Sequence, residues 1–534
     1  MFVHQGLAHF ATTQPKLVAV VTVVIFLAAW RTALSYEKSK RYLRQYPWVG
    51  VNKSQWFGLL RGAVQSFRHA AQFGLEGYSK FSKQNQLWVC VDHTGAPEIM
   101  MSPSHLDEAL RIDSVLLDTH THISKLLAEE YVFGGYGVPL SVAAHESTLM
   151  CGVSKNLNAM TPAICDETVH ALETHWGGDG EWQEMRIMAA CADVVGQITN
   201  RMLVGLPLCR NATFLRRAKR WSRVVLQTAW VIYMLPDFIK PLLGPLLAVP
   251  SILCHHRALR MVIPVAQERL DKREKRAAGD TSTGAWDKPL DYMKFLLDEG
   301  SDAFNHVLDQ NPTTLARAAL MVNAAAFHAT GLTLANLLLD VFSASPEVAD
   351  ALRAEALTIQ REYGLESKLG LSKMTKMDSA IRESMRLHVL GIKAMHRYVK
   401  PKEGFTFSNG DHVPYGAHLS LPVLGRHLDE EVYPNATHYD AFRFSRERSD
   451  EDKTARVKAA VNASPNHLAW GIGKSQCPGR FFAVDELKLI MAHVLIYYEV
   501  EHIPVRPKNI FISSQSIPPL TASLRFRRRS TEQP

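Results

Sequence analysis

The chain has 534 residues, of which 47% are hydrophobic and 21% charged, with a mean hydropathy of −0.08. These values exclude an intrinsically disordered chain, a collagen-like repeat and a protein with many membrane spans. Sixty Lys and Arg against fifty-two Asp and Glu give a net charge of +8, which fits an acidic partner or lipid headgroups and does not indicate nucleic-acid binding. The seven scattered cysteines form no C-x-x-C pair, so we expect reduced thiols rather than a zinc ribbon or a disulfide framework.

The N-terminal segment predicts a membrane anchor. Residues 17–34 contain one charge, at Arg31, and as a helix they would reach about 27 Å, close to the thickness of the thinner bilayers. Basic residues follow at 38, 40, 41 and 44, so the positive-inside rule places the rest of the chain in the cytosol. The alternative is a cleaved signal peptide, with residues 33–35 as the cleavage site. We expect residues 1–45 to be a single-pass anchor in the endoplasmic reticulum membrane, with residues 46–534 forming one domain.

Helical patterns dominate that domain. Asn311 and Pro312 predict the start of a long apolar helix that ends before Pro346, and its polar interruptions favour a buried central helix over a membrane span. Strand patterns lie mainly at 85–101 and 397–420, with a hairpin expected at 405–410, while the polar stretch 272–288 predicts a surface loop. The sequence therefore predicts a mainly α fold with small β-sheets.

The richest chemistry lies around Cys477. Glycines surround this cysteine, Pro478 follows it, and an apolar helix is expected from about residue 480 to residue 498. The free N–H groups at a helix N-terminus stabilise a thiolate, which could act as a nucleophile or as a metal ligand; a buried structural thiol is the plainer alternative. A single thiolate with no companion ligand fits a haem iron better than zinc.

Here the chain resembles a known family. The run WGIGKSQCPGRFFA at 470–483 is similar to the haem-binding signature of the cytochrome P450 family, F-x-x-G-x-[R/H]-x-C-x-G. The resemblance implies a P450 fold over residues 46–525 and haem b with Cys477 as the axial ligand of its iron. Ser475 stands where Arg or His normally reaches a haem propionate, and Lys474 is the candidate replacement. The implied cofactor-binding residues of this run are Trp470, Gly471, Gly473, Lys474 and Gly479.

Other motifs follow in the family's order. Glu383 and Arg386 match E-x-x-R, and Arg443 matches the arginine of the P-E-R-F element. The resemblance implies that these three residues form a network that braces the loop around Cys477. It also implies that Arg397, and by a weaker match Lys155, contact the haem propionates, which need cationic partners when buried.

The long helix departs from the family pattern [A/G]-G-x-[D/E]-T-[T/S]. His328 replaces the acidic residue, and Ala329 replaces the first threonine, which leaves Thr330 about 100° further round the helix. We expect His328 and Thr330, or an ordered water, to deliver protons; a satisfied core histidine is the alternative for His328.

The resemblance, most specific to fungal membrane-bound members of secondary-metabolite pathways, implies a haem-thiolate monooxygenase. It would use O2 and NADPH-derived electrons, delivered by NADPH-cytochrome P450 reductase, to oxidise a hydrophobic small molecule such as a terpenoid intermediate. Substrate contacts are expected at Phe327, Ile392 and Ile517. Three alternatives stay open: a haem-thiolate isomerase, dehydratase or peroxygenase; a non-catalytic haem-binding protein; and a membrane-anchored cysteine hydrolase without haem.

Overall fold

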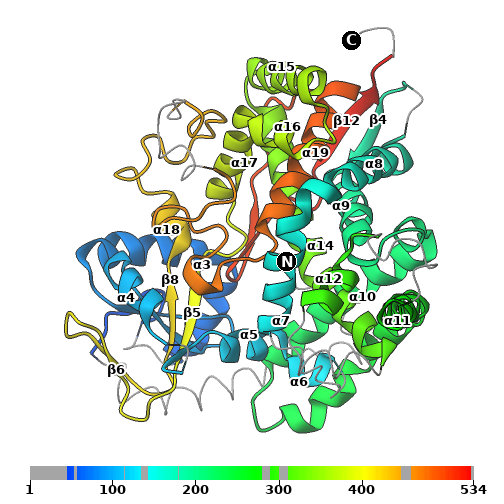
Figure 1. Ribbon diagram of the computed structural model, residues 1–534. Helices are drawn as coiled ribbons and strands as arrows, with labels where there is room; N and C mark the ends of the chain where they lie inside the picture. Colours follow the sequence, from blue (N-terminus) through cyan, green and yellow to red (C-terminus); the bar gives the residue numbers. More distant parts are fainter. Residues whose placement is uncertain are drawn as a thin grey trace, which may run out of the picture.

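The computed structural model describes residues 45–52, 57–113, 115–133, 142–177, 180–279, 289–299, 311–446 and 459–530, so the expected anchor lies outside these ranges apart from its last residue. Helices account for most of the described residues, in agreement with the predicted fold class (Figure 1). They are α3 Gly58–Lys80, α4 Leu106–Arg111, α5 His120–Leu127, α6 Glu129–Val132, α7 Val142–Ser147, α8 Leu157–Trp176, α9 Ile187–Val204, α10 Ala212–Met234, α11 Lys240–Ala277, α12 Tyr292–Glu299, α14 Pro312–Ser343, α15 Pro346–Tyr363, α16 Lys368–Lys373, α17 Thr375–Leu387, α18 Val423–His427 and α19 Arg480–Tyr497.

Four small sheets complete the described part of the fold. Their strands are β1 Trp88–Val91, β2 Pro97–Met100, β3 Leu117–Asp118, β4 Gln183–Arg186, β5 Ala394–Val399, β6 Phe405–Thr406, β7 His412–Val413, β8 His418–Leu421, β9 Tyr498–Val500, β10 Ile510–Ile512, β11 Gln515–Ile517 and β12 Ser523–Arg528. The largest sheet has the order β1-β2-β8-β5-β3, in which β2 and β8 run parallel with Ile99 opposite Leu419. The strand regions predicted at 85–101 and 397–420 are confirmed, and β6 and β7 form the expected hairpin.

The central helix is α14. Its N-cap is Asn311, whose side chain accepts a hydrogen bond from the Thr313 N–H at 2.9 Å, and Pro312 occupies the first turn, as the sequence predicts. By length and composition alone α11 and α14 could each cross a membrane, but 61% of the apolar window of α14 is buried, which marks it as a core helix. The prediction of a loop from residue 272 is wrong for its first six residues, because α11 continues to Ala277 through Lys, Arg and Glu, which are good helix formers.

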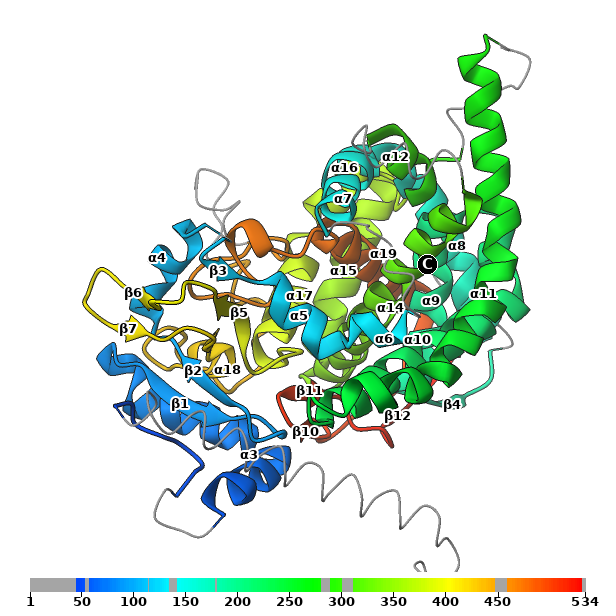
Figure 2. The ribbon, with the colours of Figure 1, turned by 90° about the horizontal axis from the view of Figure 1, so that it is seen from below.

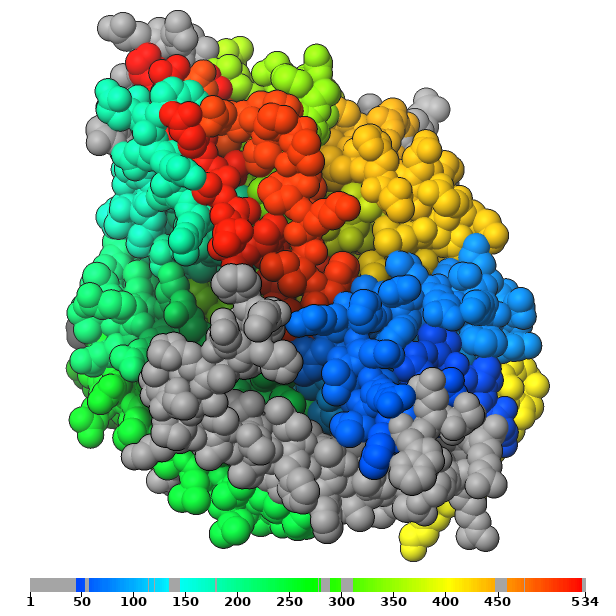
Figure 3. Space-filling view, turned by 180° about the vertical axis from the view of Figure 1, so that it is seen from behind, coloured from blue at the N-terminus to red at the C-terminus, as the bar shows by residue number. Residues whose placement is uncertain are grey.

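The helices divide the molecule into two sides. The five-stranded sheet and α3 lie on one side, helices α8 to α12 lie on the other, and α14, α17 and α19 run between them (Figures 1 and 2). From behind, the C-terminal segments form a red and orange band between the teal α8–α9 region and the blue N-terminal region (Figure 3). The segment that carries Cys477 leads directly into α19, so it lies at the junction of the two sides.

Candidate functional site

Cys477 lies at the end of an irregular segment that precedes α19. Its backbone N–H donates to the Trp470 carbonyl at 2.8 Å, which closes the segment into a loop. Gly471 and Gly473 have φ values of 69° and 71°, in the left-handed region that favours glycine. A Cβ on Gly473 would also lie 2.7 Å from the Leu110 Cδ2 atom, so a side chain at this position would collide with α4. The glycines thus allow the loop a tight path that other residues would not.

The pKa of the Cys477 thiol lies above its ordinary value. Burial raises its pKa, while the backbone N–H groups of Gly479 and Arg480 and the charge of Arg480 act in the opposite direction. Of the seven cysteines, Cys477 and Cys151 are partly accessible and the other five are buried. A cation at the sulfur atom would shift the balance to the thiolate, because a metal ligand must be deprotonated. The donor set at Cys477 therefore fits a bound metal.

The remaining residues of the signature lie around this loop. The indole Nε1 of Trp470 donates to the Ala460 carbonyl at 2.7 Å, and the ring packs against the larger hydrophobic core. No atom lies within 4 Å of a Cβ built on Gly479, so there is open space beside that residue. Lys474 is exposed, and the side chain of Ser475 is outside the described part of the chain.

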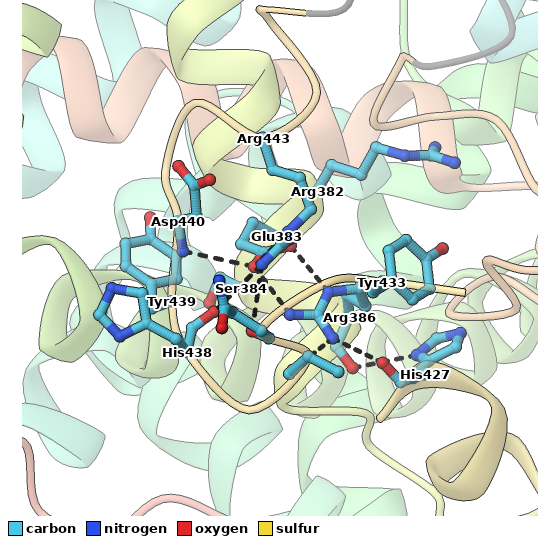
Figure 4. Close-up of polar contacts among 12 residues, drawn as sticks. Arg382, Glu383, Ser384, Arg386, His427, Tyr433, His438, Tyr439, Asp440 and Arg443 are labelled. Carbon is cyan, nitrogen blue, oxygen red and sulfur yellow. Dashed lines mark hydrogen bonds and ion pairs between the residues drawn. The ribbon is translucent and has the colours of Figure 1, made fainter. Parts of the chain in front are cut away.

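Glu383, Arg386 and Arg443 meet as expected (Figure 4). The first two lie on α17 with fully buried side chains, and Arg386 donates from Nε to Glu383 Oε2 at 2.8 Å and from Nη2 to Oε1 at 2.7 Å. The Arg443 Nε donates to the same Oε1 atom at 3.0 Å. The Nη1 atom of Arg386 donates to the carbonyls of His427 and Ala436. One buried carboxylate thus joins α17 to the segment that contains Arg443.

His427 extends this network to the Cys477 loop. Its Nδ1 lies 3.0 Å from the Arg386 carbonyl, and its Nε2 accepts from the Leu468 N–H at 2.8 Å, two residues before Trp470. Burial lowers the pKa of His427 to about 3, so the ring is neutral, donating at one nitrogen and accepting at the other. Sequence reasoning missed this histidine, because nothing in the Arg426–His427 pair distinguishes a bridging side chain from an exposed one.

Arg397 is a buried cation on β5. Its side chain is 6% exposed, and its Nη1 donates to the His396 carbonyl at 2.9 Å. Burial lowers the pKa of Arg397, and the charge of Asp118 offsets part of this decrease. No carboxylate lies within ion-pair distance of Arg397 in the described ranges. A buried guanidinium of this kind fits an anionic group such as a haem propionate.

Lys155 is exposed in a short turn before α8. Met150, five residues earlier, has its sulfur 3.6 Å from the Nη1 atom of Arg480. The chain just before Lys155 therefore lies beside the start of α19, although the Lys155 side chain makes no ion pair with another described residue.

One face of α14 is partly open although most of the helix is buried. The accessible residues in the middle of the helix recur every three or four positions and so share one face; they are Met321, Val322, Ala325, Ala326, His328, Ala329, Leu332 and Thr333. Phe327 was expected to contact the substrate, but it lies about 160–200° round the helix from Ala325 and Ala329. Its ring packs on α9 so closely that a Cβ on Gly196 would lie 2.6 Å from it. The apolar residues on several faces of α14 did not show in the sequence which face is open, and the substrate contact expected of Phe327 stays a prediction.

His328 lies at the edge of that open face, and Thr330 lies outside it. The His328 ring hydrogen-bonds the backbone of Ser222 on α10, and its Nε2 is buried with no hydrogen-bond partner among the described residues. Burial lowers its pKa, and the nearby charges of Arg223 and Lys219 lower it slightly further. Thr330 is 7% exposed. The hydroxyl that does lie on the open face is that of Thr333, which donates to the Ala329 carbonyl at 2.9 Å.

Ile392 and Ile517 come from segments that lie side by side. Gly391 forms a β-bridge with Gln515, and the Ile392 N–H donates to the Ser514 carbonyl at 2.9 Å. Ile392 is 3% exposed within the core cluster of the five-stranded sheet, while Ile517 is partly accessible at the end of β11.

Comparison with known proteins decides the family. The model of the family "Cytochrome P450" matches residues 147–526, which is more than half of the chain. The chain belongs to the cytochrome P450 family. It is similar to cytochrome P450 monooxygenase polB of Polytolypa hystricis, with 29% identity over 91% of this chain and 94% of that protein. It is 28% identical to cytochrome P450 monooxygenase gloP of Glarea lozoyensis over 92% of each chain, and 29% identical to cytochrome P450 monooxygenase okaG of Penicillium ochrochloron over 91% and 94%. The protein is thus a P450 monooxygenase, and its family implies a haem-thiolate cofactor, a redox partner and a small-molecule substrate.

Proposed function

We propose that this P450 holds haem b through the Cys477 thiolate and oxidises a hydrophobic small molecule, by hydroxylation or in several steps. The electrons come from NADPH through NADPH-cytochrome P450 reductase, and the substrate is a fungal secondary-metabolite intermediate such as a terpenoid. The observation that carries the proposal is the position of Cys477, a partly accessible thiol that ends a glycine-dependent loop at the start of α19 and receives two backbone N–H groups. Fungal relatives that are named cytochrome P450 monooxygenases support the reaction class.

The residues of the chain have distinct roles in this proposal. Cys477 would supply the thiolate that holds the haem iron, Arg397 and Lys155 would pair with the propionates, and the signature residues Trp470 and Lys474 flank the loop. Gly471, Gly473 and Gly479 let the backbone approach the cofactor. The haem supplies the iron at which dioxygen is activated. Glu383, Arg386 and Arg443 keep the loop in place through His427, which joins the network to the Leu468 N–H.

Proton delivery is assigned to His328 and Thr330. The buried Nε2 of a neutral His328 has no hydrogen-bond partner among the described residues and can accept a proton, and because burial lowers the pKa of the ring the proton is readily passed on. The test compares His328→Gln and Thr330→Val with the wild type in the amount of product formed per NADPH consumed. If these residues relay protons, the variants should consume more NADPH without forming product, while substrate binding stays unchanged. A ratio of product to NADPH equal to that of the wild type would show that His328 has only a packing role in the core.

A second candidate function is favoured by Ala329. This residue lies on the open face of α14, where it offers no hydroxyl, so the chain lacks the threonine that the family uses in oxygen activation. A haem-thiolate isomerase, dehydratase or peroxygenase would not need it. Reconstitution with and without NADPH and reductase distinguishes the two functions: product only in their presence supports the monooxygenase, and turnover in their absence supports the second candidate.

The protein is proposed to face the cytosol from the endoplasmic reticulum membrane, anchored by residues 1–45. Support comes from the basic residues that follow the apolar segment and from exposed apolar side chains at the start of α11, where Leu242 is 72% exposed and Leu246 is 65% exposed. Protease treatment of sealed microsomes tests the orientation. We expect the protease to digest the 46–534 domain without detergent. Protection of this domain would show that it lies in the lumen, which contradicts the proposed orientation.

The substrate class is tested with the reconstituted enzyme. Candidate terpenoid, alkaloid and polyketide intermediates are supplied with reductase and NADPH, and products are identified by mass spectrometry. Substrate binding is expected near Ile392 and Ile517, which occupy adjacent segments. Oxidation of the terpenoids alone supports the proposed class, and oxidation of another class alone would replace it.

A further inference from the structure

A groove between α8, α9 and α10 carries a strong excess of positive charge. Its cavity volume is about 660 Å³, and α14 forms its floor through Asn323 and Phe327. Helix α9 packs against both α8 and α10, and all three lie on the right of Figure 1. The charged side chains that line this cavity, here called the α10 groove, are Arg210, Arg216, Lys219, Arg220 and Arg223 against the single carboxylate of Asp193.

Internal ion pairs satisfy two of these cations. Arg210 pairs with Asp166 and with the buried Glu167, and Lys219 pairs with Asp193. The other three arginines form no ion pair with any residue for which the structure gives a position, and Arg216 bonds a neutral hydroxyl, that of Thr213. The α10 groove therefore retains three guanidinium groups without a counter-charge.

These three arginines share one face of a firmly held helix. Their positions, 216, 220 and 223, follow the spacing i, i+4 and i+7, which puts like charges together at a cost to helix stability. The opposite face of α10 is anchored by Phe214 and Trp221, both fully buried, and the helix begins with an Asn211 cap that accepts from two backbone N–H groups at 3.0 Å. The helix thus holds three like charges close together, and a bound anion would relieve their repulsion.

We propose that the α10 groove binds a polyphosphate group, carried by a small organic molecule or by a lipid headgroup. A guanidinium group can form two parallel hydrogen bonds to the oxygens of one phosphate. It therefore suits this ligand better than the ammonium group of a lysine would. Arg216, Arg220 and Arg223 lie within about 10 Å of one another along the helix axis, so their long side chains can converge on one polyphosphate group. The cavity volume is within the range of small-molecule sites, and Phe327 gives its floor an apolar surface for the organic part.

The test is calorimetric titration of inorganic tripolyphosphate into the haem-loaded full chain in detergent. We expect one site per chain, with affinity that falls as salt is raised, because the three arginines are exposed. The double variant Arg220→Gln/Arg223→Gln is expected to bind about tenfold more weakly. The matched control is Arg217→Gln, an exposed arginine of the same helix that bonds the Arg257 carbonyl and does not line the groove; it is expected to bind as the wild type does.

Thermal unfolding by circular dichroism shows whether both variants keep the fold. Vesicles with and without a phosphoinositide lipid then identify the source: vesicle binding that depends on Arg220 and Arg223 assigns a headgroup, and tripolyphosphate binding alone assigns a soluble ligand. The proposal is overturned if folded wild-type protein does not bind tripolyphosphate, or if the control variant loses as much affinity as the double variant. Binding of a penta-glutamate peptide in preference to tripolyphosphate would also overturn it, in favour of an acidic protein partner.

Discussion

The substitution Glu383→Gln tests the buried network most sharply. It keeps the shape of the side chain and removes the charge that faces both Arg386 and Arg443, at N–O distances of 2.7 and 3.0 Å. Because Glu383 and Arg386 are both 0% exposed, water cannot replace the lost charge. Removing one partner of such a pair costs about 3–5 kcal/mol.

The expected change in melting temperature follows from the size of the domain. With an unfolding entropy of about 2.1 cal/mol/K per residue over roughly 490 residues, 1 kcal/mol corresponds to about 1 °C, so Glu383→Gln should lower Tm by about 3–5 °C. The matched control is Glu76→Gln, which breaks the exposed i, i+4 pair with Lys80 and should cost less than about 0.5 kcal/mol. Circular dichroism of haem-loaded protein measures both shifts.

A double variant measures how strongly the effects of Glu383 and Arg386 on stability are coupled. Adding Arg386→Met to Glu383→Gln removes the cation left without its partner, so the two changes together should cost less than the sum of the single changes. The reasoning is refuted if Glu383→Gln melts within 1 °C of the Glu76→Gln control, or if the single costs simply add.

Three further changes test separate parts of the site. Gly473→Ala places a side chain at a positive φ and against Leu110, so it should destabilise the protein by about 1–2 kcal/mol. Gly74→Ala, inside α3 with no atom within 4 Å, should stabilise it by about 0.5–1 kcal/mol. The two variants should therefore shift the melting temperature in opposite directions. Arg397→Gln should release haem about tenfold faster to apomyoglobin, while Lys400→Gln, at an exposed residue directly after β5, should not; equal rates would exclude the propionate contact. His427 binds a proton more readily unfolded than folded, so its contribution to stability is complete above about pH 6.5 and falls by about 1.4 kcal/mol per pH unit toward pH 3. His427→Asn should flatten the Tm–pH curve between pH 7.5 and 5, and a parallel curve would contradict the neutral bridge.

Local signals predicted much of the fold correctly. Asn311 with Pro312 marked the start of α14, and the change from glycine-rich loop to apolar run placed the start of α19 at residue 480. These signals work because caps, prolines and turn glycines act over a few residues, within the range that sequence patterns report.

Features that depend on distant contacts were beyond the sequence. Phe327 lies on a helix that is apolar on several faces, so its direction toward α9 is set by the tight packing on Gly196. The bridge made by His427 needs Arg386 and Leu468, which are 41 residues away on either side. The α10 groove likewise depends on three helices meeting, whereas the sequence shows only a basic surface helix.

The most direct test of the central claim is the absorption spectrum of the reduced, carbon-monoxide-bound protein. The account predicts a Soret band at the red-shifted position of a thiolate-ligated haem in the wild type and in Cys151→Ala, which removes the other partly accessible cysteine. It predicts loss of that band in Cys477→Ala. A wild type without the thiolate-type band, or a Cys477→Ala variant that retains it, would contradict the assignment of Cys477 as the haem ligand.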